Sequence, residues 1–182
     1  VEGQLGLPFL GYVEHIESST FGGDKGKGML IALHQPKSPF AEEFRTISTN
    51  IFFSIPDKPK KSILITSATA EEGKTLIAVN LAIVMARLGK KVLLVDADMR
   101  KPNIHLLFKI KRTPGLSDFL AQGADLSSLL WPTPVKDLYV VSVGTAAPNP
   151  AELLISQRMV NFIEEMREKF DFVILDTPPA MM

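Results

Sequence analysis

The chain has 182 residues, 46% of them hydrophobic, so it is about the size of one ordinary domain and can fill a single core. Twenty basic residues balance twenty acidic ones, which excludes an overall field that would hold the chain on nucleic acid or on an anionic membrane. No cysteine is present, so disulfides, thiolate metal sites and cysteine nucleophiles are excluded as well.

The first 37 residues are predicted to be a connector followed by a flexible linker. Residues 5–13 are apolar and interrupted by turn residues, so they could add a short strand or lie against the main body. Residues 18–28 are rich in Ser, Gly and Lys, a composition typical of a flexible linker. The chain opens with Val1 and has no basic-then-apolar signal segment, and we expect an upstream part to precede it.

The main domain, residues 38–182, is predicted to begin with an amphipathic helix. Ser38 is suited to the N-cap and Pro39 to the first helical position, while Glu42–Glu43 fall in the first turn, where carboxylates interact favourably with the helix dipole. Apolar residues then recur at helical spacing and give the helix one apolar face: Phe44, Ile47, Ile51 and Phe52.

Four short apolar runs are predicted to be strands buried between layers of helices, because both faces of each run are apolar. They are Ile63–Ile65, Val92–Val95, Tyr139–Val143 and Phe172–Leu175. Helices are predicted at about 73–88, 115–120 and 151–170, and a proline-rich turn around Trp131. This alternation predicts a layered α/β fold with a mostly parallel sheet, incomplete at the C-terminus.

The loop after the first predicted strand fits the phosphate-loop pattern, with Ala68 in place of the usual first glycine. Its residues are Ser67, Ala68, Thr69, Ala70, Glu71, Glu72, Gly73, Lys74 and Thr75, and Leu76 follows in the helix. Such a site needs inward backbone amides, a helix N-terminus, a lysine for the β- and γ-oxygens and a hydroxyl for magnesium. The alternative is an ordinary strand-to-helix turn that happens to contain Gly-Lys-Thr.

Two further loops follow buried strands and carry carboxylates. Asp96 and Asp98 leave the second strand one residue apart, with Arg100 just beyond, and Asp176 leaves the last strand before Thr177–Pro178. Because the carboxyl ends of parallel strands meet at one edge, we expect these acids to face a single metal-phosphate site. The alternative for each acid is a helix cap or a turn former.

Together the three motifs resemble the Walker A, Walker A′ and Walker B signature of the bacterial tyrosine kinases, the BY-kinases of capsule and exopolysaccharide assembly. Residues 115–120 and 144–154 are similar to segments between that family's second and third motifs. Residues 5–11 are similar to the connector that leaves the second transmembrane helix in single-chain members. The resemblance covers nearly all of the chain and implies a P-loop NTPase-like fold.

The resemblance also implies a function, that of an ATP-dependent protein-tyrosine autokinase regulating polysaccharide polymerisation and export. ATP and Mg²⁺ would be the cofactors. The partners would be other copies of the protein, phosphorylated in trans within a homo-oligomer, and a transmembrane polysaccharide co-polymerase region in the same or a separate chain. The domain would lie at the cytoplasmic face of the bacterial inner membrane and bind no nucleic acid.

In this resemblance each site residue acquires a role. Lys74 would bind the β- and γ-phosphates, Thr75 and Asp96 would lie near magnesium, and Asp176 would position its water shell. Asp98 would help to deprotonate the attacking tyrosine hydroxyl, although orientation and charge neutralisation usually matter more than a base in phosphoryl transfer. Arg100 would stabilise the loop or a neighbouring subunit's phosphate, or form a structural ion pair.

The chain departs from the family pattern at two places. Family members commonly carry Pro where Ala70 stands, a change that removes no amide donor. The oligomerisation pattern Glu-x-x-Arg-x-x-Arg is present as Glu42, Arg45 and Ser48, so the last arginine is missing. Assembly into a ring, usually an octamer in this family, is therefore expected to be weaker.

The tyrosine-rich tail that such kinases phosphorylate is not in the sequence, whose two tyrosines are Tyr12 and Tyr139. Tyr139 begins a predicted core strand and is expected to be buried. Tyr12 lies in the connector and is expected to be structural rather than a phosphorylation site.

Two rival functions stay open at this point. The first is a partitioning ATPase of the MinD/ParA type, in which water replaces tyrosine as the acceptor. Those proteins usually carry a second lysine early in the phosphate loop, where this chain has Thr69, so the kinase is favoured. The second is a non-catalytic regulator of polysaccharide chain length that binds ATP and transfers little.

Overall fold

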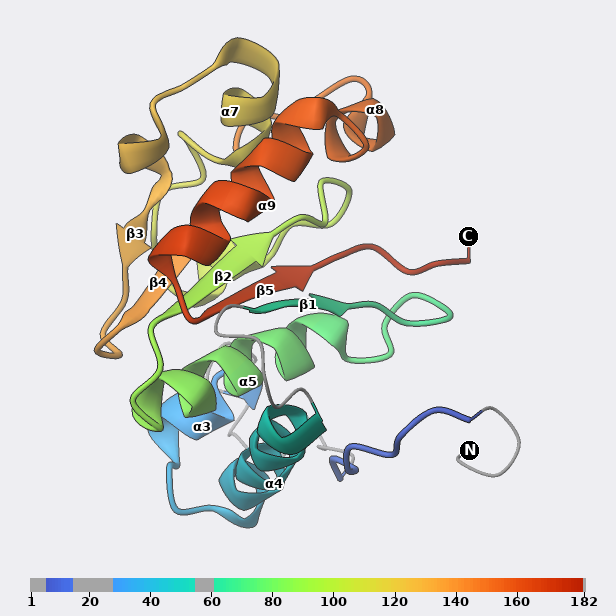
Figure 1. The fold of residues 1–182 in the computed structure, drawn as a ribbon, viewed down its shortest axis with the longest axis vertical. Coiled ribbons are helices and arrows are strands. Elements are labelled where there is room, and N and C mark those ends of the chain that lie inside the picture. The colour runs from blue at the N-terminus through green and yellow to red at the C-terminus, as the bar shows by residue number, and fades with distance from the viewer. Residues whose placement is uncertain (1–5, 15–27, 55–60, 182) are drawn as a thin grey trace.

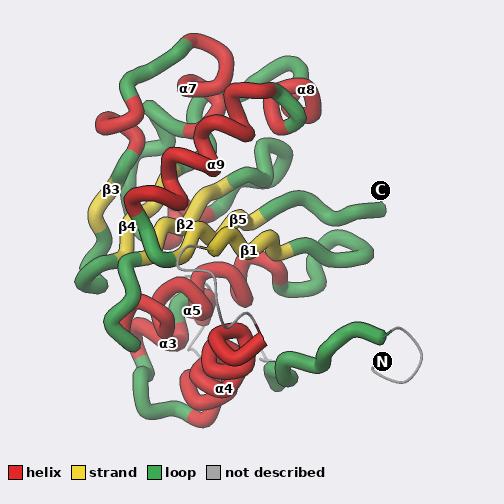
Figure 2. The backbone as a smooth tube through the Cα atoms, viewed as in Figure 1, coloured by secondary structure: helices red, strands yellow, loops and turns green. Residues whose placement is uncertain are grey.

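The computed structural model describes residues 6–14, 28–54 and 61–181 (Figures 1 and 2). Within these residues the α-helices are α3 (Ile31–His34), α4 (Pro39–Ser54), α5 (Lys74–Arg87), α6 (Ile104–Leu107), α7 (Leu116–Gln122), α8 (Pro150–Leu154) and α9 (Gln157–Lys169). A 3₁₀ helix spans Leu126–Leu129. The strands are β1 (Lys61–Ile65), β2 (Val92–Asp96), β3 (Trp131–Pro132), β4 (Leu138–Val141) and β5 (Phe172–Asp176).

The sheet has the strand order β1-β5-β2-β4-β3, and every neighbouring pair is parallel except β3 with β4. The prediction of a mostly parallel sheet in a layered α/β fold is therefore confirmed. The strand β3 lies where a proline-rich turn was predicted around Trp131. Two residues are too short a run to show the alternation of a strand, and Pro132 is tolerated because β3 ends the sheet, where its missing N–H costs no ladder bond.

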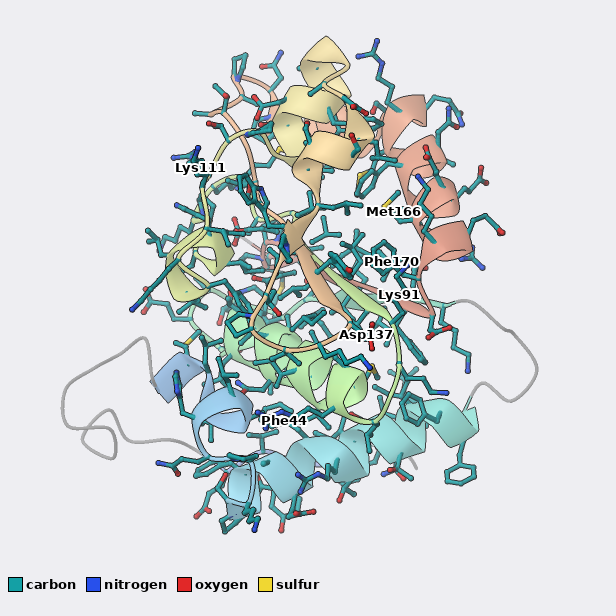
Figure 3. The ribbon with its side chains drawn as sticks, turned by 90° about the vertical axis from the view of Figure 1, so that its left-hand side faces the viewer. Phe44, Lys91, Lys111, Asp137, Met166 and Phe170 are labelled. Atoms are coloured by element: carbon teal, nitrogen blue, oxygen red, sulfur yellow. The ribbon has the colours of Figure 1, made fainter. Side chains whose placement is uncertain are left out.

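Helices cover both faces of the sheet, with α3, α4 and α5 on one side and α7, α8 and α9 on the other (Figure 1). Side chains of β2 alternate between two cores, because successive residues of a strand point to opposite faces. Val92 and Leu94 pack toward α5, whereas Leu93 and Val95 pack toward α9. In Figure 3, Phe44 lies between α4 and α5, and Met166 and Phe170 lie between α9 and the sheet.

The prediction that all four strands are buried on both faces is wrong for β1. Ile63 and Ile65 pack against the core on the α5 side, but Leu64, on the opposite face, is 61% exposed. The strand stands at the end of the described sheet, with β5 as its one paired neighbour. An unbroken apolar run therefore did not identify a central strand.

The single helix predicted over residues 151–170 is two helices in the structure. The first, α8, ends at Leu154, and Ser156 takes an extended backbone conformation and caps α9, its Oγ accepting a hydrogen bond from Met159 N. Serine at an N-cap satisfies amides that a continuous helix would bond to its own carbonyls. Five apolar side chains of this segment are expected to face inward; Met159, Phe162 and Met166 are buried, whereas Leu154 and Ile163 are half-buried.

The packed domain begins before the predicted boundary at Ser38. Leu30, Ile31 and Ala32 are buried, so α3 belongs to the core rather than to a linker. Asn80 of α5, itself fully buried, accepts a hydrogen bond from Ala32 N and donates to Met29 O, both at 2.8 Å. These bonds fix residues 29–32 to the helix that begins at the phosphate loop. Residues 15–27, including most of the predicted linker, and Leu5 lie outside the described residues.

The first turn of α4 agrees with the sequence prediction. Ser38 Oγ accepts a hydrogen bond from Ala41 N at 3.3 Å, and Phe44 and Ile51 lie on the buried face. Residues 6–14 form neither a helix nor a strand and lie against α4, where Asn50 Nδ2 donates to Leu10 O at 2.8 Å. Of the two possibilities left open for this segment, it lies against the main body.

Candidate nucleotide and metal site

The three predicted loops converge because β1, β5 and β2 are adjacent and parallel. Asp176, at the end of β5, stands in register with Ile65 at the end of β1 and with Asp96 at the end of β2. The phosphate loop leaves β1 and leads into α5, whose second residue, Thr75, donates from Oγ1 to Asp176 Oδ2 at 2.6 Å. One edge of the sheet thus presents a helix N-terminus, a lysine, a hydroxyl and two strand-end carboxylates.

The phosphate loop has a compact backbone held by its own side chains. Glu72 Oε2 accepts a hydrogen bond from Thr69 N at 3.0 Å, and this bond lowers the pKa of Glu72. Ser67 Oγ donates to Thr69 O at 2.6 Å. Gly73 has φ = 87°, a backbone conformation that glycine adopts without strain, and Lys74 opens the helix directly after it.

The turn after β5 is bonded along the first residues of the phosphate loop. Thr177 N donates to Ile65 O, Ala180 N to Ser67 O and Met181 N to Ala68 O, at 2.9 to 3.2 Å. The proline-containing turn and the loop therefore form one rigid unit. Lys74 is only 9% exposed, and its positive charge acts to lower the pKa of Asp176.

Asp96 and Asp176 are almost wholly buried, with 1% and 2% of their surface exposed. Burial raises the pKa of Asp96 to about 7, helped by the charges of Asp176 and Asp98 and opposed by hydrogen bonds from the backbone, including Ile104 N at 3.1 Å. Burial likewise raises the pKa of Asp176 to about 6, against the hydrogen bond from Thr75. The site therefore concentrates negative charge that a cation would relieve.

One carboxylate oxygen of each acid has no hydrogen-bond partner although it is buried, Asp96 Oδ1 and Asp176 Oδ1. An orphaned buried carboxylate oxygen is a costly feature unless a cation or its water completes it. The Asp176 carboxyl is bonded to the Thr75 hydroxyl, and Asp96 stands in register beside Asp176, so the three side chains offer a set of oxygens that suits magnesium. Within the described residues no three acidic or histidine side chains form a metal cage, so phosphate oxygens and water would supply the remaining ligands.

Asp98 is a turn former in the structure, one of the two alternatives that the sequence left open. Its Oδ1 accepts from Arg100 N at 3.1 Å and from Lys101 N at 3.0 Å, so it caps the turn after β2. Its charge also raises the pKa of both Asp96 and Asp176, so it belongs to the same acidic cluster. With Arg100 it lines a cavity of about 350 Å³ between the phosphate loop and the turn after β5, whose other walls include Ala70, Pro178 and Met181.

Three features of the site carry no signal in the sequence. The Ile104 amide that bonds Asp96 lies eight residues further along the chain. Lys101 Nζ lies 3.7 Å from Glu71 Oε1 and joins two of the loops. Glu71 has φ = 66°, in the left-handed region that favours glycine.

This backbone conformation predicts that Glu71→Gly will stabilise the chain. Relief of the left-handed strain is expected to raise the free energy of unfolding by up to about 1 kcal/mol. The greater conformational entropy of glycine in the unfolded chain offsets part of this gain. Urea denaturation measures the effect. Glu71→Gln is the control, because it removes the exposed ion pair to Lys101 and keeps the strain. A glycine variant no more stable than the glutamine variant would contradict the prediction.

The raised pKa values predict how metal-free stability depends on pH. A carboxyl with a folded pKa above its unfolded value of 3.8 holds its proton more tightly when folded, so its contribution to stability is lost as the pH rises through about 7. Asp96→Asn cannot ionise and avoids this loss. We expect the variant to gain about 2 kcal/mol on the wild type between pH 5 and pH 8 in urea denaturation without metal or nucleotide. An equal difference at both pH values would contradict it.

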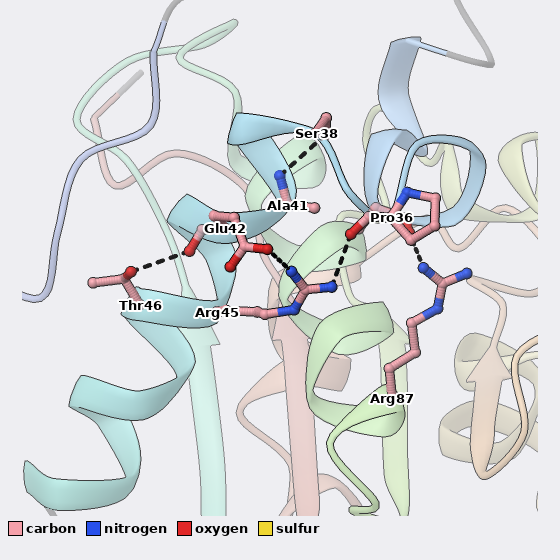
Figure 4. Close-up of polar contacts among 8 residues, drawn as sticks. Pro36, Ser38, Ala41, Glu42, Arg45, Thr46 and Arg87 are labelled. Carbon is pink, nitrogen blue, oxygen red and sulfur yellow. Dashed lines mark hydrogen bonds and ion pairs between the residues drawn. The ribbon is translucent and has the colours of Figure 1, made fainter.

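Two residues of the oligomerisation pattern, Glu42 and Arg45, lie together near the start of α4 (Figure 4). Glu42 is exposed and pairs with Arg45, whose Nη2 also donates to Pro36 O at 2.8 Å. Ser48 is fully buried and donates from Oγ to Phe44 O at 2.7 Å. The missing arginine therefore corresponds to a position on the core side of the helix.

The two tyrosines differ from expectation. Tyr12 has 71% of its surface exposed, so it contributes little to packing. Tyr139 is half-buried, with its ring against that of Phe170 at a centroid distance of 5.7 Å. None of the helices within residues 6–14, 28–54 and 61–181 is both long and apolar enough to cross a membrane.

Known proteins with similar sequences are tyrosine kinases. The tyrosine-protein kinase YwqD of Bacillus subtilis is 43% identical over 159 residues, which are 87% of this chain and 67% of YwqD. The putative tyrosine-protein kinase CapB of Staphylococcus aureus is 38% identical over 145 residues, 80% of this chain and 64% of CapB. The chain thus spans about two thirds of the length of these relatives.

Solved structures support the same assignment. The chimerical protein CapA2B2 superposes with a TM-score of 0.85 and 40% identity over 98% of this chain and 74% of the chimera. MinD of Pyrococcus horikoshii, solved with Mg-ADP, superposes with a TM-score of 0.58 and 26% sequence identity. The match covers 67% of this chain and 50% of the MinD chain. The fold is therefore that of P-loop nucleotide-binding proteins, and the MinD/ParA alternative is not favoured.

The family profile described as an AAA domain matches residues 60–182, from the first strand of the sheet through all three loops of the site. Together with the 43% identity to YwqD, this match shows that the chain belongs to the AAA-domain P-loop proteins and, among them, to the bacterial tyrosine kinases.

Proposed function

We propose that the protein containing this chain is an ATP-dependent protein-tyrosine autokinase that regulates capsule or exopolysaccharide polymerisation and export. The proposal rests on three features that lie at one edge of the sheet. They are Lys74, the hydrogen-bonded pair Thr75–Asp176, and the Asp96 oxygen that has no hydrogen-bond partner. The relatives in this family are named tyrosine-protein kinases, and one is described as lying in a cps region.

Different groups of the site are proposed to bind the phosphates and the magnesium ion of the nucleotide. The amides of residues 70–76 would surround the β-phosphate and Lys74 would neutralise the β- and γ-oxygens, while Thr75 and Asp96 would hold magnesium and Asp176 its water shell. When bound, magnesium neutralises charge on the phosphate oxygens. Thr75, already fixed by Asp176, needs little reorganisation to reach the metal.

Asp98 is the proposed residue that orients the acceptor tyrosine and takes part in removing its proton. The cavity of about 350 Å³ that Asp98 lines opens beside the phosphate loop and has apolar walls at Pro178 and Met181, which suit an aromatic ring. Arg100 lines the same cavity and is placed to meet a phosphate oxygen. The acceptor would come from a second copy of the protein.

Phosphate transfer in the full-length protein tests the proposal. With magnesium and ATP, an autokinase yields phosphotyrosine at a rate comparable to its consumption of ATP. Free phosphate without phosphotyrosine would instead identify a MinD/ParA-like ATPase, and ATP binding with neither product would identify a non-catalytic regulator. Either of these results would overturn the proposal.

The partners and location proposed here follow from the same family. The chain would lie at the cytoplasmic face of the inner membrane beside a transmembrane co-polymerase region, in the same or a separate polypeptide. The curated relative in the cps region matches this chain over only 22% of its own length, which supports the presence of further regions in such proteins.

Self-assembly of the full-length protein is expected to be weaker than that of family members with a complete pattern. Arg45 is engaged by Glu42 and Pro36 O of its own chain, and Ser48, buried and bonded to Phe44 O, supplies none of the planar, multi-donor ion pairing of an arginine. Light scattering at low micromolar concentration should therefore show species smaller than a closed ring. A stable ring under these conditions would contradict the expectation.

A further inference from the structure

The segment 6–14 is held on the surface of α4 by apolar packing and by hydrogen bonds. Leu10 and Val13 pack against the core on the α5 side, and Leu10 O accepts from Asn50 Nδ2 at 2.8 Å. Glu14 N donates to Glu43 Oε2 at 3.1 Å. The segment has no helix or strand of its own, so side-chain packing and hydrogen bonds such as these hold it against α4.

Tyr12 lies in the middle of this segment and points away from it. Its neighbours Gly11 and Val13 are half-buried, whereas Tyr12 itself is 71% exposed. An accessible phenol on a backbone that is neither helical nor paired in a sheet can be presented to an enzyme without unfolding the domain. Tyr139 cannot be presented in this way, because it belongs to β4 and its ring is packed against that of Phe170.

The same segment borders the nucleotide site. Val13 and Glu14 line a cavity of about 320 Å³ whose other walls are Glu71, Glu72, Gly73, Leu76 and Ile77. The position of the segment is therefore coupled to the phosphate loop and to the first turns of α5. A chemical change on Tyr12 would act one residue from this shared wall.

We propose that Tyr12 is a phosphate acceptor of the kinase activity proposed above, on which this inference rests, and that its phosphorylation releases the segment 6–14 from α4. The Tyr12 phenol oxygen of one copy bonds to the γ-phosphorus of ATP held by a second copy. The bond from that phosphorus to the β,γ-bridging oxygen breaks, ADP leaves with the electron pair, and the phenol proton passes to Asp98 and from there to water. The product is a phosphate monoester that carries close to two negative charges.

The new charge would be placed on a surface that is already acidic. Glu14 follows two residues later and is exposed, Glu43 accepts from its amide, and Glu71 and Glu72 share the cavity wall with it. Lys101 lies beside one of these carboxylates, with its Nζ 3.7 Å from Glu71 Oε1. Repulsion between phosphate and carboxylates therefore opposes the docked position and loosens one wall of the cavity beside the phosphate loop.

A mixture of two full-length variants tests the acceptor. Lys74→Met, which keeps Tyr12 and lacks the lysine for the phosphates, is incubated with magnesium, ATP and Tyr12→Phe, which can donate phosphate and has lost only an exposed hydroxyl. Mass spectrometry is expected to find phosphate on Tyr12 of the Lys74→Met copy and none on Tyr139. Phosphotyrosine elsewhere on that copy but not on Tyr12 would overturn the inference and leave the proposed function standing. The lack of phosphotyrosine on every residue of both copies and of the wild type would overturn both.

Hydrogen exchange of the phosphorylated full-length protein tests the release. Exchange across residues 6–14 is expected to speed up about tenfold relative to unphosphorylated protein, because a few like charges at this range weaken docking by about that factor. Exchange in α9, on the opposite face of the sheet, serves as the internal control and should not change. Equal exchange in residues 6–14 before and after phosphorylation of Tyr12 would overturn the proposed release.

Discussion

Lys74→Met is expected to weaken binding of ATP to this chain about 100-fold or more, as measured by calorimetry with magnesium present. Lys74 begins α5 directly behind the phosphate loop, and its charge already acts on Asp176. Methionine fills a similar volume but cannot neutralise the β- and γ-oxygens. Because Lys74 is only 9% exposed among carboxylates, the variant should also lose some stability without losing its fold.

Lys101→Met is the matched control for this experiment. Lys101 is also close to the phosphate loop and lines the same cavity as Asp98, but its side chain is 76% exposed and pairs with the exposed carboxylate of Glu71. Its loss should change the affinity for ATP by a factor of only about two to three, as expected for an exposed charge. Equal affinity in Lys74→Met and the wild type would show that the phosphates are not bound at this loop.

Magnesium with ATP is expected to raise the midpoint of thermal unfolding by about 5–10 °C at saturating concentrations, well beyond ATP without metal. The buried carboxyls explain the difference, since Asp96 and Asp176 are costly to ionise without a cation and each keeps an unpartnered oxygen. Asp96→Asn should remove most of the metal dependence. Its amide oxygen can still accept from Ile104 N, so the fold should be retained.

Asp98→Asn separates binding from phosphate transfer. The asparagine oxygen can keep the hydrogen bonds from Arg100 N and Lys101 N, so the turn and the metal-dependent shift should be preserved. Phosphotyrosine formation by the full-length protein should fall, because the group proposed to orient the acceptor hydroxyl has lost its charge. If Asp96→Asn and Asp98→Asn behave alike in both assays, the pair must be treated as one metal-binding unit.

The convergence of the site could be predicted from sequence because it depends on strand ends. Apolar runs that end in Asp96 and Asp176 fix which residues leave the sheet, and parallel pairing brings all such ends to one edge. The helix after the phosphate loop could be predicted as well, because Gly73 and Gly89 stand on either side of its apolar pattern. Both glycines have positive φ in the structure. Local chemistry and topology agree at these positions, so the prediction needed no long-range contact.

Other features depend on contacts that a sequence pattern does not contain. Leu64 is exposed because of the order of strands in the sheet, which the apolar run Ile63–Ile65 does not specify. The break at Ser156 and the burial of α3 depend on how helices pack against the sheet and against Asn80. Within the site, the left-handed backbone of Glu71 could not be foreseen, because the residue type disfavours it.

One cation is expected to bind together with ATP between Thr75, Asp96 and Asp176. Paramagnetic broadening of amide signals by manganese tests this binding most directly. Manganese prefers the same oxygen ligands as magnesium, so in the presence of ATP it should broaden the backbone amide signals of Thr75, Ala97 and Thr177 in this 20.0 kDa chain. Excess magnesium should restore them, and Asp96→Asn should weaken the broadening. Broadening centred instead on the exposed acidic residues of α9, Glu164 and Glu165, or the same broadening with and without ATP, would contradict the account.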